Sequence, residues 1–563
     1  MNAFARNRST SAAVIAIAAV MLGICGTSTS VAAQTVPKTA SIQRPPMGWS
    51  SWNSFSNTVN SQVIVNQAKA MVASGLKKAG YQYVNIDEGW WLGNRDKKGN
   101  IVVEAGMWPA LAKGERDGDM SNIVRYIHSL GLKAGIYTDA GRNGCGTFFP
   151  DVGPGYPGEG SEGHYDQDFL QFARWGFDYV KVDWCGGDKE NLDPAVQYGE
   201  IARAITRAEA ITGHRLFYSI CNWGKQSPWT WAPNVGGSPA NIWRTSGDIV
   251  DPIVAGTKNA GRRASFEKML GNFDKGIHPE AQHTGFYNDP DMMVIGMPGL
   301  NDAENRAHMG LWAISGAPLI VGADLTGLSD ATRSILTNPE VIAIDQDPLG
   351  LQAVKVHSEV NGIEVWSKWL SRPGERAIVL LNRTDAKAPV IMAPVDVRWK
   401  DLGLAGKSAT VRDPWTGKDL GKFDDHYVAT LQRGDVVLLV VKGTDEKWTS
   451  VAPASGQSFT IKTGNCDQPI VPVQILYRNP EAKAAYAELR VNGQMPTRIA
   501  FPPTGTEQAA VWLQVQMDLP AQGVSARNEL RFSMLGGAGL KIESIRVPRT
   551  GPCEVASESR SQN

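Results

Sequence analysis

The stretch FDYVKVDWCGG (residues 177–187) places a lysine and an aspartate, Lys181 and Asp183, two residues apart at the end of an apolar run. Alternate residues of a strand point to the same face, so these two side chains would lie together. A buried carboxyl group is costly unless it is paired or used. The pair is therefore either an internal ion pair or a carboxylate nucleophile that a neighbouring ammonium keeps ionised.

A second carboxyl group is needed if this chemistry is glycoside hydrolysis. One carboxyl attacks or stabilises the sugar, while the other protonates the leaving oxygen. The stretch WRTSGDI supplies Asp248 just beyond another apolar run, with Arg244 in the same segment. The plainer interpretation of Asp248 is a helix N-cap or a solvated loop acid.

Two further stretches end apolar runs in acidic residues. VNIDEGWW carries Asp87 and Glu88, and adjacent acids at the end of a buried strand indicate a polar ligand. NDPDMMVIG carries Asp289 and Asp291, for which a turn built from Asn, Asp and Pro is the plainer interpretation.

Other chemistries have little support in the sequence. It contains no GxSxG, HExxH or CxxC motif and no phosphate-binding glycine loop, and its eight histidines lack ligand-like spacing. We therefore expect neither a metal nor a cofactor. The 56 basic and 56 acidic residues balance, which gives no electrostatic reason to expect nucleic acid or an anionic membrane as a partner. The oligomeric state stays open.

The elements that must position these acids follow a strand-then-helix alternation. Helical periodicity appears between the strands, for example at 63–80 and 120–131. Eight such units over about 300 residues predict a (β/α)8 TIM barrel, whose active site lies at the carboxyl ends of its strands. The candidate strands are 47–52, 81–87, 133–139, 177–183, 216–222, 242–246, 285–289 and 317–322.

The pattern changes to alternating strands after DQDPLG, at residues 345–350. We expect a catalytic barrel at 34–343, an antiparallel β-sandwich at 344–445, and a linker followed by a second, C-terminal β-domain at 446–563. Cys466 and Cys553 bracket the last domain, which predicts a disulfide that closes it.

The N-terminus predicts a signal peptide at residues 1–33. Arg6 and Arg8 precede an apolar run at 12–25, and small residues lead to a cleavage site after Ala33. An uncleaved anchor is the alternative, but the run is short for a membrane-spanning helix. We expect a secreted or periplasmic protein without a membrane partner after cleavage. Five cysteines would remain, so one stays unpaired.

Taken together, eight stretches resemble glycoside hydrolase family 27, the α-galactosidase (melibiase) family, over about residues 44–440. The resemblance implies a retaining hydrolase of terminal sugars with a barrel followed by a β-sandwich. It assigns the nucleophile to Asp183 and the general acid/base to Asp248, and retention requires the two carboxyls to lie about 5–5.5 Å apart. The stretches are PPMGWSSWNSF, YVNIDEGWW, GLKAGIYTDAG, FDYVKVDWCGG, YSICNWG, WRTSGDI, NDPDMMVIG and RAHMGLWAISGAPLIVGADL.

The resemblance also implies the residues that hold the sugar and a disulfide beside the nucleophile. The disulfide falls on Cys145 and Cys185, which leaves Cys221 as the unpaired thiol. Carboxylates and a lysine can hold neighbouring hydroxyls by charge-assisted hydrogen bonds, while a tryptophan offers an apolar wall. The expected sugar-binding residues are Trp52, Asp87, Glu88, Tyr137, Lys181, Asn222, Arg244 and Asp291.

Two positions depart from the family pattern. Asn222 stands where many members have Glu, a variant that fungal-type members share, and Glu88 stands in place of the usual Asp. A longer acid at position 88 would crowd the C6 group of galactose and favour β-L-arabinopyranose, which lacks that group. The expected substrate is a terminal α-D-galactoside in an oligo- or polysaccharide.

Four alternatives stay open. Within the family these are a β-L-arabinopyranosidase and a member acting on α-glucans, and outside the enzyme class a non-catalytic sugar-binding protein, which would be expected to lack Asp183 or Asp248. The fourth concerns the C-terminal region, which loosely resembles a jelly-roll carbohydrate-binding module but could equally be a structural β-domain.

Overall fold

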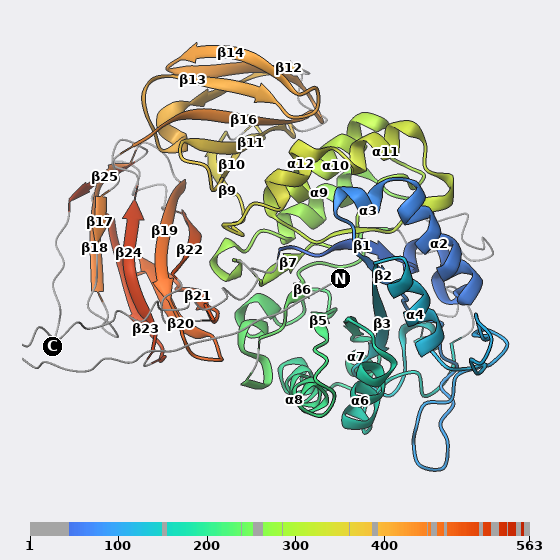
Figure 1. Cartoon of the computed structure of the whole chain (residues 1–563). Coiled ribbons are helices and arrows are strands. Elements are labelled where there is room, and N and C mark those ends of the chain that lie inside the picture. Colours follow the sequence, from blue (N-terminus) through green and yellow to red (C-terminus); the bar gives the residue numbers. More distant parts are fainter. Residues whose placement is uncertain are drawn as a thin grey trace, which may run out of the picture. The chain divides into compact units, whose positions relative to one another are not determined.

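The structure is a computed structural model of the chain (Figure 1). Within the described residues, every helix is too short or too polar to cross a lipid bilayer. The predicted signal peptide lies outside these residues and stays a prediction. The described residues are 44–148, 155–237, 239–250, 263–283, 285–359, 361–384, 392–446, 449–451, 459–466, 470–505, 510–518, 528–537, 539–547 and 553–556.

The first part of the chain forms the predicted barrel. Its eight strands form one sheet in the order β7-β6-β5-β4-β3-β2-β1-β8, and every neighbouring pair in that order is parallel. The strands are β1 (Met47–Ser50), β2 (Tyr83–Asn85), β3 (Lys133–Asp139), β4 (Tyr179–Asp183), β5 (Phe217–Ile220), β6 (Ile242–Arg244), β7 (Tyr287–Asp289) and β8 (Leu319–Val321).

The seam between β7 and β8 is closed by residues that follow β7. Met293 forms a parallel bridge with Val321. The Met293 amide donates to the carbonyl of Ile320 over 2.7 Å, and the Gly322 amide donates to the carbonyl of Met293 over 2.9 Å. The segment that carries Asp291 is thus part of the ring.

Helices surround the ring of strands (Figure 1). Several begin at side chains that cap their first turn: Asn60 caps α2, Asp193 caps α8 ahead of a proline, and Asn301 with Glu304 forms a capping box at α10. The helices are α1 (Trp52–Phe55), α2 (Ser61–Ala73), α3 (Leu76–Ala79), α4 (Ser121–Ser129), α5 (Cys145–Phe148), α6 (Tyr165–Trp175), α7 (Cys185–Lys189), α8 (Pro194–Thr212), α9 (Phe266–Lys275), α10 (Asp302–Ser315), α11 (Asp330–Leu336) and α12 (Pro339–Asp345).

The strand β4 shows how the sequence pattern sorts side chains in the barrel. Val180 and Val182 are fully buried in the core cluster that also contains residues of the surrounding helices. Lys181 and Asp183 alternate with them and therefore point to the barrel interior.

The middle part of the chain is an antiparallel β-sandwich, as predicted. A six-stranded sheet, in the order β14-β13-β16-β11-β10-β9, and the β12–β15 pair share one apolar core. The strands are β9 (Val354–Ser358), β10 (Ile363–Trp369), β11 (Glu375–Asn382), β12 (Met392–Arg398), β13 (Leu404–Asp413), β14 (Lys418–Asp424), β15 (His426–Gln432) and β16 (Val436–Asp445).

The last part contains two further antiparallel sheets, in the orders β17-β24-β19-β22 and β21-β20-β23-β18-β25, around a separate core. The predicted linker includes the short strand β17. Backbone pairing places Cys466 opposite Cys553, but their side chains lie outside the described residues, so this disulfide stays a prediction. The strands are β17 (Thr449–Val451), β18 (Phe459–Cys466), β19 (Ile470–Arg478), β20 (Ala485–Val491), β21 (Thr497–Phe501), β22 (Val511–Asp518), β23 (Asn528–Met534), β24 (Lys541–Val547) and β25 (Cys553–Ala556).

Candidate active site

Lys181 lies at the centre of the acidic strand ends. Its ammonium nitrogen is 3.0 Å from Oδ2 of Asp87, which follows β2, and 3.5 Å from Oδ2 of Asp183, which ends β4. Burial alone would lower the pKa of Lys181, but the charges of Asp87 and Asp183 raise this pKa well above its ordinary value. The lysine is therefore a fixed positive charge between two carboxyl groups.

Asp183 is nearly enclosed, with 7% of its side chain exposed. Its Oδ1 accepts a hydrogen bond from the backbone amide of Trp184 at 3.0 Å. Burial raises the pKa of Asp183, Lys181 opposes that rise, and the charges of Asp87 and Asp248 add to it. Lys181 and the Trp184 amide thus favour the ionised form of this carboxyl.

Arg244, the last residue of β6, organises a second group of acids. Its NH2 nitrogen lies 3.0 Å from Oδ2 of Asp291 and 3.2 Å from Oδ1 of Asp248. The Arg244 and Asp291 side chains are 5% and 3% exposed, whereas that of Asp248 is 53% exposed. Asp248 therefore stands at the rim of the site and is open to water.

Asp291 is held in a strained backbone conformation. Its φ is 98°, a region that residues other than glycine rarely adopt. Its two carboxyl oxygens accept hydrogen bonds from the amides of Ile249 (2.8 Å) and Met292 (2.7 Å). Burial raises the pKa of Asp291 to about 6, although Arg244 opposes the rise. The Asp291 amide donates to Oδ1 of Asp289 over 2.9 Å, which holds the backbone so that the Asp291 carboxyl faces Arg244.

A cavity of about 30 Å3 lies among these groups, enough space for one or two water molecules. Both cations and the acids Asp87 and Asp291 line it, together with apolar side chains such as Ile86 and Ile320. The lining residues are Ser50, Asn85, Ile86, Asp87, Ile136, Tyr179, Lys181, Ser219, Cys221, Arg244, Asp289, Asp291, Met292 and Ile320.

Glu88 points to a different neighbour from Asp87. Its Oε1 accepts a hydrogen bond from the amide of Gly146 over 2.7 Å, and a side chain at Gly144 would approach that oxygen to 2.4 Å. Burial and the charge of Glu159 raise the pKa of Glu88 well above its usual range. The extra methylene thus carries this carboxyl to the loop of Cys145.

The other expected sugar-binding residues occupy the same end of the barrel. Tyr137 lies on β3 with the Lys181 ammonium 5.2 Å from its ring centre. Asn222 is buried beyond β5 and donates from Nδ2 to the carbonyl of Lys225 over 2.7 Å. Trp52 is half-buried and begins α1, with one residue between it and the end of β1, where the sequence predicted strand.

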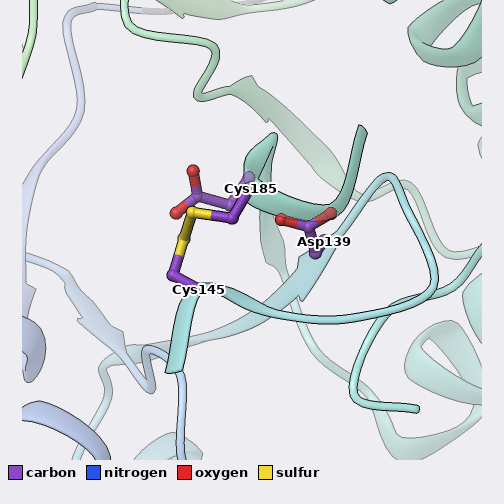
Figure 2. Close-up of side chains that lie close together, drawn as sticks. Asp139, Cys145 and Cys185 are labelled. Carbon is purple, nitrogen blue, oxygen red and sulfur yellow. A yellow bond between two sulfur atoms is a disulfide. The ribbon is translucent and has the colours of Figure 1, made fainter. Parts of the chain in front are cut away.

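The predicted disulfide joins Cys145 of α5 to Cys185 of α7 (Figure 2). Cys221 is the one free cysteine of the described residues, as predicted, and Arg244 NH1 lies 3.6 Å from its sulfur. The two bridged sulfurs lie within 4.8 Å of a carboxylate oxygen of Asp183, but a disulfide removes both thiolates as metal ligands.

Sequence reasoning missed Asp139, which is buried beside this disulfide (Figure 2). Its position, two residues after Tyr137 at the end of an apolar run, repeats the spacing of Lys181 and Asp183 and was the available signal. It also missed Ser50, whose hydroxyl donates to Oδ2 of Asp87 over 3.1 Å.

The barrel and its ring of carboxylates at the strand ends define the class of a (β/α)8 glycoside hydrolase. The sequence model of the family described as alpha galactosidase A matches residues 44–347, and that of the alpha galactosidase C-terminal β-sandwich domain matches 360–441. A third model, described as the CBM13 domain of alpha-galactosidase, matches 460–542. The chain belongs to the α-galactosidase family, glycoside hydrolase family 27.

Individual relatives agree with this assignment. The α-galactosidase of Oryza sativa subsp. japonica is 39% identical over 66% of this chain and 78% of that protein. Alpha-galactosidase A of Cellvibrio japonicus is 43% identical over 61% of this chain and 76% of its own. The crystal structure of α-galactosidase I from Mortierella vinacea matches with a TM-score of 0.61 and 29% identity, covering 73% of this chain and 100% of that one.

Proposed function

We propose that this glycoside hydrolase is a retaining exo-glycosidase that removes terminal α-D-galactosyl groups from oligo- or polysaccharides. One observation carries the proposal: two carboxyl groups, Asp183 and Asp248, each stand beside a cation, Lys181 or Arg244, at the ends of β4 and β6. The names of the relatives support galactose as the sugar.

In the first step, the ionised carboxylate of Asp183 attacks the anomeric carbon. The bond to the leaving oxygen breaks, and that oxygen takes its proton from the carboxyl group of Asp248. Enclosure suits Asp183, because a desolvated nucleophile faces the sugar, and exposure suits Asp248, because the aglycone must leave past it. The product of the step is a galactosyl ester of Asp183.

In the second step, the carboxylate of Asp248 removes a proton from a water molecule, which attacks the same carbon. The ester bond breaks and Asp183 leaves as a carboxylate. Two inversions give net retention. Lys181 favours the carboxylate form of Asp183 both before its attack and after its release from the ester, because the ammonium opposes the rise that burial causes in the pKa of Asp183.

The remaining charged groups would hold the sugar hydroxyls. Asp87 and Asp291 present acceptors that are already oriented by Lys181, Arg244 and backbone amides, so little reorganisation is needed on binding.

The test is azide rescue with an aryl α-D-galactopyranoside that has a good leaving group. Asp183→Ala should lower kcat on the order of 10⁴-fold, and azide should restore turnover with β-galactosyl azide as product. Asp248→Ala with azide should give the α-azide instead. An Asp183→Ala enzyme that keeps its activity would overturn the nucleophile assignment.

A β-L-arabinopyranosidase is the second candidate, and Glu88 is the observation that favours it. Its carboxyl is buried and fixed by the amide of Gly146. A longer acid that cannot swing away would crowd a C6 group more than the shorter aspartate would.

The deciding comparison uses aryl α-D-galactopyranoside and aryl β-L-arabinopyranoside with the wild type and Glu88→Asp. The arabinopyranosidase hypothesis expects the wild type to prefer the arabinoside and the variant to shift at least about tenfold towards the galactoside, since one methylene is worth about 1–3 kcal/mol. Wild-type preference for the galactoside with an unchanged ratio in the variant would rule it out.

We also propose that the enzyme is exported and that residues 1–33 are removed. The disulfide between Cys145 and Cys185 supports export, because such bonds persist in oxidising compartments. The N-terminal sequence of the mature protein tests this, and it should begin at Gln34.

A further inference from the structure

Asp139 and Asp183 stand side by side as the last residues of adjacent parallel strands, β3 and β4. They are register partners, as are Tyr137 and Lys181 before them. Side chains that pair in register lie on the same face of a sheet. A carboxylate oxygen of Asp139 lies within 4.8 Å of one of Asp183, and Asp139 is fully buried.

The Asp139 carboxyl group joins two segments of chain. Its Oδ1 accepts hydrogen bonds from the amide of Gly141, in the turn after β3, at 2.7 Å, and from the amide of Gly186, in α7, at 3.1 Å. The helix α7 begins two residues after Asp183. The carboxyl therefore connects the turn after β3 to the backbone that leads away from Asp183.

The two segments touch backbone to backbone at this point. A Cβ atom at Gly141 would lie 2.3 Å from the carbonyl carbon of Gly186, and one at Gly186 would lie 2.5 Å from the oxygen of Asn143. The disulfide from Cys145 to Cys185 joins the same two segments, because Cys145 follows Asn143 in the chain and Cys185 precedes Gly186. A covalent bond and a buried carboxyl thus fix the same junction.

We propose that Asp139 is a positioning residue for the hydrolysis, which clamps the turn after β3 to α7 and so holds the Asp183 carboxylate at the distance and angle for attack. The inference rests on the proposed role of Asp183 as nucleophile. It assigns to Asp139 no contact with the sugar.

The environment of Asp139 also favours the protonated form of its carboxyl group. Burial, together with the charge of Asp183, raises the pKa of Asp139 to about 8, although the amides of Gly141 and Gly186 oppose the rise. Burial therefore favours the neutral form of Asp139. The ionisable groups that interact with it from the packed elements are Asp183 on β4, Tyr137 on β3, Tyr165 on α6 and Tyr198 on α8.

The test compares Asp139→Ala with Asp139→Asn in the full-length enzyme, using an aryl α-D-galactopyranoside. The alanine variant loses the clamp, and we expect kcat to fall about 100-fold, the effect of a 1 Å misplacement, while KM changes less than about threefold. Asparagine keeps an oxygen acceptor and is neutral, so it should restore kcat to within about fivefold of wild type.

Asp345 offers a matched control. It is also a buried acid, and burial raises its pKa to about 8. It is the last residue of α12, and the side chain of the next residue, Gln346, donates a hydrogen bond to the carbonyl of Pro45, ahead of β1. Asp345→Ala should lower thermal stability but leave kcat within about twofold. If kcat fell in Asp139→Ala only because the protein is less stable, kcat would fall in Asp345→Ala as well.

Three outcomes overturn the inference: an Asp139→Ala enzyme with kcat within threefold of wild type, an Asn variant as slow as the Ala variant, or an equal loss in the Asp345 control. If Asp139→Ala fails to fold, Gly186→Ala disturbs the same junction and should lower kcat at least about tenfold with little change in KM. Failure of the proposed function is a separate result, because it appears as full activity in Asp183→Ala without azide.

Discussion

Replacing Lys181 by methionine is expected to make the activity strongly pH-dependent on the acid side. Methionine keeps most of the volume of the lysine stem but removes the ammonium that lies 3.5 Å from Asp183 and 3.0 Å from Asp87. Lys181 opposes the rise that burial causes in the pKa of Asp183. Without it, that pKa rises further, and the proposed nucleophile Asp183 must be ionised to attack.

The size of the effect follows from the geometry. Two unit charges 3.5 Å apart interact by about 5 kcal/mol at an effective dielectric constant of about 20. Solvent recovers part of this, and removing one partner of a buried pair costs about 3–5 kcal/mol. We therefore expect kcat/KM to fall about 10²- to 10⁴-fold near pH 5. The loss should shrink as pH rises and Asp183 ionises again.

The assay is the pH profile of kcat/KM on an aryl α-D-galactopyranoside. Lys355→Met is a matched control, because Lys355 also pairs with a largely buried acid, Glu364, at 2.8 Å, but in the β-sandwich. Its profile should coincide with that of the wild type. A loss in Lys181→Met that is equal at every pH would refute the reasoning, since Lys181 would then only bind the sugar.

Two further predictions concern stability. Replacing Cys145 and Cys185 by serine opens a loop whose ends are 40 residues apart, which should lower the free energy of unfolding by about 4 kcal/mol; an unchanged urea midpoint would contradict this. Burial lowers the pKa of His308 to about 3. Between about pH 6.5 and 3 the unfolded chain therefore binds a proton that the folded enzyme does not, and the free energy of unfolding decreases as the pH is lowered. His308→Leu should remove about 1 kcal/mol of this loss per pH unit, which thermal unfolding at a series of pH values would detect; parallel curves for the two proteins would argue against it.

The strands were predictable because apolar runs ending in acids are strong signals. The strand β3 has the predicted bounds, and β4, β5 and β7 lie inside theirs, shorter because the end residues leave the ladder to form loops. The helix predicted at 63–80 is divided at Gly75, whose φ is 88°. A single periodic run of apolar residues continues through that break and could not reveal it.

The partners within the site were harder to predict, because they depend on contacts between distant segments. The spacing in the sequence suggested that Lys181 pairs with Asp183, whereas its nearer partner is Asp87, 94 residues earlier in the chain. The hydrogen bond of Glu88 to Gly146 is equally remote in sequence. Local sequence patterns therefore identify which residues lie at the carboxyl ends of the barrel strands, but not which of these residues contact one another.

The seam of the barrel has a consequence for dynamics. The bonds that close the ring between β7 and β8 come from Met293, two residues after the strained Asp291. A sugar bound to Asp291 would therefore stabilise the hydrogen bonds that close the barrel between β7 and β8. Amide hydrogen exchange at Met293 and Gly322 should slow when a sugar is bound. Sugar binding and local opening of the barrel between β7 and β8 would then be thermodynamically coupled.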